Sequence, residues 1–254
     1  DKFPLDKGRK AVLNPLINSI FNINQANFIK RGGLEKYHEL FIREGCEPNE
    51  KYSFISVMAT YYKMSPHSLV KLIIEKMDIL TFIKLNNGDL LKQFCPNIKN
   101  IMNNDDHIQS FIEFSKVHTE FIDKYVKYPI KSYTKDQLKT ELETNGKVRR
   151  MYIIFHAFEY FKMYLGDMNI YKDYKLLWHL FSLPLPYLIS YKKKSLGFNI
   201  IILEMDDNDQ ISLVMPDYSS VYTDYQSKPA ILLIKYKHYF ESIIYSINKK
   251  VGET

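Results

Sequence analysis

Apolar side chains recur at helical spacing through roughly the first 180 residues of the chain. Between residues 105 and 125 they form one face of an amphipathic helix. Ser53 precedes a run that fits a buried helix, and we expect this serine to be its N-cap. Thr134 and Gln137 match a capping box, which predicts a helix that begins at Gln137. Other helices are expected within 15–28, after Ser65-Pro66, over 148–165 and over 173–182.

The hydrophobic period changes towards the C-terminus, where four strand-like runs follow the prolines at 184 and 186. They cover residues 198–204, 211–215, 230–235 and 239–247. A turn rich in Asp and Asn joins the first two runs, and a tight turn joins the last two, as in β-hairpins. The pattern predicts an α+β chain whose mainly helical first two-thirds precede a small antiparallel sheet. We expect an irregular or helical N-terminal segment over 1–33, and one α+β domain over 34–254 with a helical insertion around 97–170.

The composition narrows the class of protein. Hydrophobic side chains make up 46% of the 254 residues, enough for a core, which excludes wholesale disorder. Cys46 and Cys95 are the only cysteines, too few for a disulfide framework, and they indicate a reducing compartment. Neither the histidines nor the Asp-rich turn at 206–209 has metal-ligand spacing, so we predict no metal and no cofactor. No apolar run reaches the roughly 20 residues that span a bilayer, so we expect no membrane partner.

The charge balance permits an acidic partner. Thirty-five basic residues against 29 acidic ones give a net charge of +6, which allows contact with nucleic acid or an acidic protein. If the chain binds double-stranded DNA, the expected phosphate ligands are the members of two basic clusters, Lys147, Arg149, Arg150, Lys192, Lys193 and Lys194. The alternative is a solvated helix start and a solvated turn. The aromatic run 151–161 after the first cluster is apolar nearly all round, so we expect it to pack in a core.

Several segments resemble one protein family in their order along nearly the whole chain. They are Lys2–Arg9, Phe41–Glu47 with Tyr52–Ile55, Leu177–Leu180 with Phe198–Glu204, and Lys228–Lys235 with Tyr239–Ile243. They are similar to the C-terminal part of the large subunit of the early transcription initiation factor of nucleocytoplasmic large DNA viruses, although Ser242 stands where that family has proline. The first residue, Asp1, is not Met, and we expect a fragment of a longer polypeptide.

This resemblance implies a function that works by binding. It implies contact with promoter DNA, with viral RNA polymerase or with other transcription-factor subunits, and no small-molecule substrate. It also implies a location in the viral factory of the host cytoplasm and in the virion.

Two further segments resemble a second family. Glu50–Ile55 stands at the start of a predicted helix, and Lys237-His238-Tyr239 stands at the turn between the last two predicted strands. They are similar to the two catalytic motifs of OTU-type cysteine proteases. The resemblance implies an OTU-like fold in which His238 has the place of the base and Ser53 the place of the nucleophilic cysteine.

Three departures from the protease motifs argue against catalysis. Ser53 replaces the nucleophilic cysteine, Lys51 replaces the glycine that leaves room for the oxyanion, and Phe240 stands where Asn or Asp would orient the histidine. Glu50 and Glu241 are substitutes for the orienting group, but strand alternation places Glu241 on the face opposite His238. We therefore expect an inactive, OTU-like pseudoenzyme with degenerate positions Glu50, Ser53 and His238.

Two alternatives to a binding module remain open. One is an OTU-like hydrolase or deubiquitinase that uses Ser53 and His238. The other is a structural scaffold module of a virion assembly. The OTU-like fold further predicts one shared core, in which Phe54, Val57 and Met58 pack against Ile202, Leu233 and Ile243.

Overall fold

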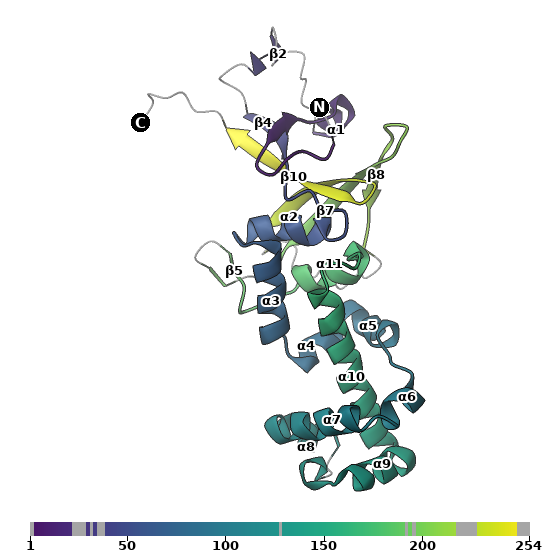
Figure 1. The fold of residues 1–254 in the computed structure, drawn as a ribbon. Coiled ribbons are helices and arrows are strands. Elements are labelled where there is room, and N and C mark those ends of the chain that lie inside the picture. The colour runs from purple at the N-terminus through teal and green to yellow at the C-terminus, as the bar shows by residue number, and fades with distance from the viewer. Residues whose placement is uncertain are drawn as a thin grey trace. The chain divides into compact units, whose positions relative to one another are not determined.

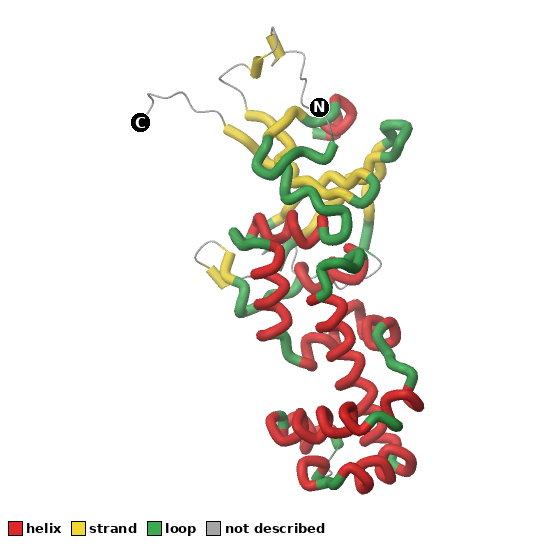
Figure 2. The backbone as a smooth tube through the Cα atoms, in the orientation of Figure 1, coloured by secondary structure: helices red, strands yellow, loops and turns green. Residues whose placement is uncertain are grey.

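The computed structural model describes residues 3–21, 29–30, 33–34, 39–126, 129–190, 193–194, 197–216 and 228–247. The chain divides into two units (Figure 1). One unit joins residues 1–73 to residues 168–254 and contains the strands, and the other covers residues 74–167 and is helical (Figure 2). In the ranges just given, no helix is long and apolar enough to cross a membrane.

Six strands form one mixed sheet in the first unit. Their order is β1 (Lys10–Val12), β4 (Glu39–Glu44), β10 (Tyr239–Ile247), β9 (Ala230–Tyr236), β7 (Asn199–Met205) and β8 (Ile211–Val214). Two short ribbons accompany it, β2 (Ile29–Lys30) with β3 (Gly33–Leu34), and β5 (Ile189–Ser190) with β6 (Lys193–Lys194). The four strands predicted near the C-terminus and the α+β class are confirmed.

The prediction of a small antiparallel sheet is wrong in two respects. β7 and β9 pair in parallel, because β8 doubles back along one edge of β7 and β9 pairs with the other edge in the direction of β7. β4 and β1 come from the N-terminal part of the chain and extend the sheet beyond β10. The sheet therefore pairs β4, near the N-terminus, with β10, near the C-terminus. Patterns within either segment do not predict this long-range pairing.

The two faces of the sheet bury different layers. On one face α2 (Ser53–Tyr61) and α11 (Tyr174–Ser182) meet the sheet, where the ring of Phe54 lies 5.2 Å from that of Phe240 and 5.9 Å from that of Phe181. On the other face Ile243 packs in a cluster with residues of the N-terminal segment and of α1 (Pro15–Ile20). Ile243 was expected to meet α2. Because side chains alternate along a strand, Phe240 and Ser242 of β10 face α2, and Ile243 faces the other side of the sheet.

The second unit is built from helices around α10 (Gly146–Gly166). The others are α4 (Ile79–Lys84), α5 (Asp89–Gln93), α6 (Ile98–Met102), α7 (Asp105–Val117), α8 (Thr119–Tyr125) and α9 (Lys135–Thr144). Two 3₁₀ turns lie at Leu85–Gly88 and Ile130–Ser132. Helix α3 (Pro66–Lys76) begins in the first unit and ends in the second. Tyr152, Phe155, Phe158 and Phe161 of α10 are buried. The expectation that this aromatic run packs in a core is confirmed.

The structure agrees with some of the helix ends that the sequence predicts and differs at others. The capping box is present: the hydroxyl of Thr134 accepts from the backbone N–H of Gln137 at 3.2 Å, and the N–H of Thr134 donates to the Gln137 side chain at 2.8 Å. The single helix expected over 105–125 is broken at His118, which ends α7 and precedes α8. Ser53 is the first helical residue of α2, and the N-cap is Tyr52, so the capping prediction for Ser53 is wrong.

Candidate functional site

Ser53 lies buried where α2 meets β10. Its Oγ accepts a hydrogen bond of 2.8 Å from the backbone N–H of Phe240, and the thiol of Cys46 donates to the carbonyl oxygen of Phe240 at 3.1 Å. The ladder between β10 and β4 ends at the pair Ser242–Glu44, so Phe240 has no backbone partner on that side. Two side chains take the place of the missing strand partner. The position that resembles a nucleophile thus has a structural contact in this fold.

His238 lies at the turn between β9 and β10, with its side chain 55% exposed. Its Nε2 is 3.8 Å from a carboxylate oxygen of the equally exposed Glu50, and its ring lies 5.2 Å from that of Tyr171. In the part of the chain that the structure describes, no hydrogen bond joins His238 to Ser53. The structure brings Glu50 and His238 together at the surface but does not complete a catalytic arrangement with the serine.

Cys46 is the one described thiol beside Ser53, and the sequence did not single it out for this place. Burial, together with the nearby charge of Glu241, raises the pKa of Cys46 to about 12. The nucleophilic form of cysteine is the thiolate, so this thiol stays protonated and unreactive at neutral pH. Cys46 is therefore a hydrogen-bond donor to β10.

Glu241 is committed to the opposite face of the sheet. Its carboxylate accepts a 2.5 Å hydrogen bond from the backbone N–H of Leu5 and lies 3.1 Å from a guanidinium nitrogen of Arg43. Burial raises the pKa of Glu241, and the bonds to Leu5 and Arg43 oppose that rise. Glu241 therefore fastens the N-terminal segment to the sheet, and it is not placed to orient His238.

A polar hollow of about 410 Å³ lies beside the loop that leads into α2. Its lining includes Glu50, Lys51 and His67. Neither Ser53 nor His238 lines it. The hollow gives the serine and the histidine no common cavity in which a substrate could meet both.

The first basic cluster is divided by the start of α10. Asn145 is the N-cap and accepts from the backbone N–H of Lys147 at 3.1 Å. The guanidinium of Arg149 turns back and donates to the carbonyl oxygens of Leu142, at 2.7 Å, and Glu143. These carbonyls belong to the last turn of α9, so Arg149 holds α9 to α10, whereas Lys147 and Arg150 are exposed on another side of the helix.

The second basic cluster is only partly described. Lys192 lies outside the described residues. Lys193 and Lys194 form β6 and pair with Ser190 and Ile189 of β5. This ribbon belongs to the first unit, whereas the Lys147 cluster belongs to the second.

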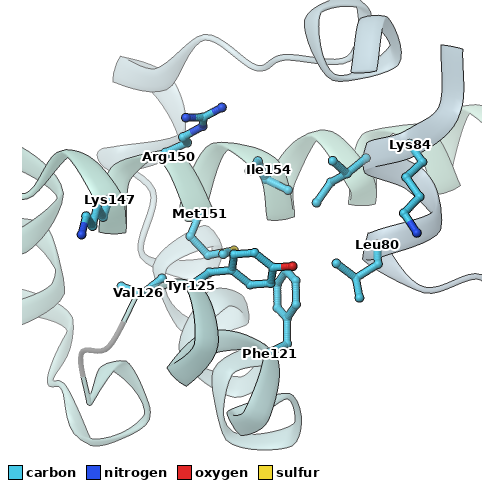
Figure 3. A pocket seen from close by; sticks show the side chains of 10 residues that line it. Leu80, Lys84, Phe121, Tyr125, Val126, Lys147, Arg150, Met151 and Ile154 are labelled. Atoms are coloured by element: carbon cyan, nitrogen blue, oxygen red, sulfur yellow. The ribbon is translucent and has the colours of Figure 1, made fainter. Parts of the chain in front are cut away.

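A groove in the second unit is lined by apolar side chains and three cations, and Figure 3 shows two of the cations, Lys147 and Lys84, at its opposite ends. It has a volume of about 460 Å³ and lies between α4, α8 and α10. We call it the α4–α8–α10 groove. Helix α4 contributes Leu80, Ile83 and Lys84, and α8 contributes Phe121 and Tyr125, followed by Val126. Helix α10 contributes Lys147, Arg150, Met151 and Ile154. Phe121 and Tyr125 belong to the apolar face that the sequence predicts for the helix over 105–125. The structure leaves Tyr125 47% exposed and Leu80 39% exposed.

The charge of the groove has a single sign. Among the described residues, its charged lining residues are Lys84, Lys147 and Arg150, and none of its lining residues is a carboxylate. None of the three forms an ion pair with another residue of the described ranges. The nearby Lys124 ammonium lies 5.5 Å above the Tyr125 ring and adds to the positive field. The groove is thus an apolar surface with unneutralised cations beside it, which suits an anionic partner that also carries apolar groups.

In the described residues, no group of three or more His, Cys, Asp or Glu side chains is arranged to hold a metal ion. Comparison with protein-family models, with curated proteins and with solved structures found no match. The inference about function therefore depends on the chain's own residues.

Proposed function

We propose that this chain is a non-catalytic binding module of a viral early transcription complex, and that the α4–α8–α10 groove holds an acidic subunit of that complex. The partner would be the viral RNA polymerase or another transcription-factor subunit. The observation that carries this proposal is the set of three cations, Lys84, Lys147 and Arg150, which line an apolar cavity and form no ion pair with another described residue. The resemblance to the viral transcription factor supplies the setting, in the viral factory and the virion.

The energetics of the groove favour a bound partner. Burial of apolar surface contributes about 25 cal/mol per Å² removed from water, and the exposed parts of Tyr125 and Leu80 are available for it. Exposed apolar surface rimmed by polar groups marks interaction sites. Cations at the rim add selectivity for acidic partners and raise the rate of association. A scaffold module held only by its fold would need none of these features.

The absence of catalysis is part of the same proposal, as is an OTU-like ancestry. α2 packs against β10, and His238 follows β9, which is the order of parts that the protease motifs require. A working nucleophile needs its base within about 3 Å. Ser53 Oγ instead accepts from Phe240, while His238 lies near Glu50 at the surface. These contacts support a fold that retains the protease-like framework without the reaction.

Promoter DNA is the second candidate partner, and a specific observation favours it. Lys147 and Arg150 are exposed in the first two turns of α10, a helix of 21 residues whose dipole favours anions at that end. The sequence predicts both residues as phosphate ligands if the chain binds DNA. A duplex would bind them without filling the apolar part of the groove.

The test measures affinity for RNA polymerase purified from virions of a large DNA virus. We expect the wild-type chain to bind, and the double variant Lys147→Glu with Arg150→Glu to bind at least tenfold more weakly. The matched control is Lys99→Glu with Lys131→Glu, which changes the net charge equally at exposed sites of the same unit away from the groove. Equal affinity of both double variants, or no binding by the wild type, would contradict the proposal.

A parallel titration with a 20-base-pair duplex tests the DNA candidate. Each phosphate that a cation neutralises contributes a slope of about −0.9 to the log–log dependence of affinity on salt. If the duplex, and not the polymerase, shows the loss in the groove variant, the partner is DNA.

A further inference from the structure

We infer that the occupant of the α4–α8–α10 groove is an amphipathic α-helix of the partner. This helix carries two carboxylates about two turns apart, and the apolar side chains between them enter the groove. This inference deepens the proposed function and takes from it that the partner is a protein. It is carried by the positions of the cations relative to the apolar floor of the groove.

One stripe of α10 forms a wall of the groove. Lys147, Arg150, Met151 and Ile154 are spaced i, i+3, i+4 and i+7, so they lie in a row along one side of the helix. At 1.5 Å per residue the row is about 10 Å long. Its cations come first and its apolar residues follow. This wall therefore changes from charged to apolar along its length.

The cation of α4 lies at the other end. Figure 3 shows Lys84 and Leu80 on the side of the groove away from Lys147, with Met151, Tyr125 and Phe121 between them. The apolar floor is thus bounded by positive charge at both ends. A ligand that fits the whole groove carries two separated anionic groups and an apolar centre.

The floor is large enough for bulky side chains. Phe121 and Tyr125 stand at i and i+4 of α8, so they face the groove together. The volume of about 460 Å³ lies within the range of about 300–1,000 Å³ that is usual for ligand pockets. Leucine or aromatic side chains of a partner would remove the exposed part of Tyr125 from water.

A helix matches this arrangement better than the other ligands with similar chemistry. In a helix, carboxylates at i and i+7 are about 10 Å apart, and apolar residues at i+3 and i+4 lie between them on the same side. A fatty acid has one anionic end and would leave the cation at the other end without a partner. A duplex presents phosphates but no apolar group for Ile83, Val126 and Ile154.

The experiment uses designed helical peptides and fluorescence anisotropy. The probe carries Glu at i and i+7 with Leu and Phe at i+3 and i+4. One control peptide has Gln in place of both Glu, and another has Ala in place of Leu and Phe. We expect the probe to bind the wild-type chain, each control peptide to bind at least tenfold more weakly, and the affinity for the probe to fall with added salt.

Variants of the chain assign the binding to the groove. Lys84→Glu and Arg150→Glu, made separately, are each expected to weaken probe binding at least fivefold, because each removes a partner of one carboxylate. Tyr125→Ala tests the apolar floor with little risk to folding, since this side chain is half exposed. The double variant of Lys99 and Lys131 is again the control and is expected to bind as the wild type does.

The outcomes separate this inference from the proposed function. If the polymerase binds through Lys147 and Arg150 but the probe neither binds nor competes, the helix is wrong and the proposed function stands. If the Gln peptide binds as well as the probe, or if oleate binds and is insensitive to Lys84→Glu, the two-carboxylate helix is overturned. If the probe binds as expected and the polymerase does not, the groove is a helix site and the proposed transcription partner is wrong.

Discussion

The backbone N–H of Phe240 donates a 2.8 Å hydrogen bond to Oγ of Ser53, which joins the start of α2 to the start of β10. The two residues are 187 positions apart in the chain. The bond satisfies a buried donor that no neighbouring strand reaches, because the β10–β4 ladder begins only at Ser242. The hydroxyl at position 53 therefore stabilises the first unit.

Replacement of this hydroxyl should destabilise the first unit. Ser53→Ala leaves the Phe240 N–H buried and unpaired, and we expect a loss of about 1–3 kcal/mol in the free energy of unfolding. The matched control is Ser56→Ala, one turn later in α2, since the buried Oγ of Ser56 has no hydrogen-bond partner among the described residues. That change should be neutral or stabilising. Urea denaturation measures both, and hydrogen exchange of the Phe240 amide should accelerate only in Ser53→Ala.

The strands were predictable because the signal for them is local. β9 is a nearly continuous apolar run, β10 is rich in aromatic residues and isoleucine, and the two meet at a tight turn. This pattern allows few other structures. The neighbours of β10 were not predictable. β4 mixes Leu40 and Ile42 with Arg43 and Glu44, a pattern that fits a helix or a strand, and only its pairing with β10 decides between them.

The site was harder to predict than the fold, since each of its features depends on which segments meet. Lys147, Arg149 and Arg150 are equivalent in the sequence, and only the position of the end of α9 gives Arg149 a separate role. Phe121 and Tyr125 fit the apolar face of a buried helix. Their partial exposure in a groove follows from the placement of α4 and α10, which no spacing within α8 encodes.

The division of the basic cluster leads to a prediction that separates stability from binding. Arg149→Ala removes charge-assisted hydrogen bonds to the carbonyl oxygens of Leu142 and Glu143, and should cost about 1.5–3 kcal/mol of stability. Lys147→Ala and Arg150→Ala should each stay within about 0.5 kcal/mol, as is usual for exposed residues without partners. In the polymerase-binding assay, Lys147→Ala and Arg150→Ala should weaken binding more than Arg149→Ala does. Equal stabilities of the three variants would contradict the role given to Arg149.

His156 should make the second unit sensitive to acid. Its Nε2 is buried and has no hydrogen-bond partner among the described residues, and its ring lies 4.8 Å from that of His107. Burial lowers the pKa of His156 from 6.5 to about 4. Because the pKa is lower in the folded chain than in the unfolded chain, this contribution to stability is complete above about pH 6.5. This contribution is lost as the pH falls from about 6.5 through about 4, and the free energy of unfolding then decreases by about 3 kcal/mol in total.

The measurement is the urea midpoint of the chain between pH 7 and pH 4. His156→Phe retains an aromatic ring among Tyr152 and Phe155, cannot be protonated, and should flatten this part of the pH dependence. The exposed His118 provides the control, and His118→Gln should leave the dependence unchanged. An equally steep decline in the His156→Phe variant would show that other groups cause the acid sensitivity.

The last prediction concerns catalysis at Ser53. An activated serine needs a base within hydrogen-bond distance, an exposed Oγ and donors for the developing oxyanion. Here Ser53 is 3% exposed and its Oγ accepts from Phe240, whereas His238 lies at the surface 3.8 Å from Glu50. The neighbouring thiol of Cys46 stays protonated because of its raised pKa. We therefore expect no turnover of ubiquitin conjugates or model esters, and no labelling of Ser53 by a fluorophosphonate. Active OTU-type protease and serine hydrolase samples verify the reagents, and Ser53→Ala gives the background. Stoichiometric labelling of the wild type that disappears in His238→Ala would establish the hydrolase alternative, because only a serine activated by that histidine reacts in this way.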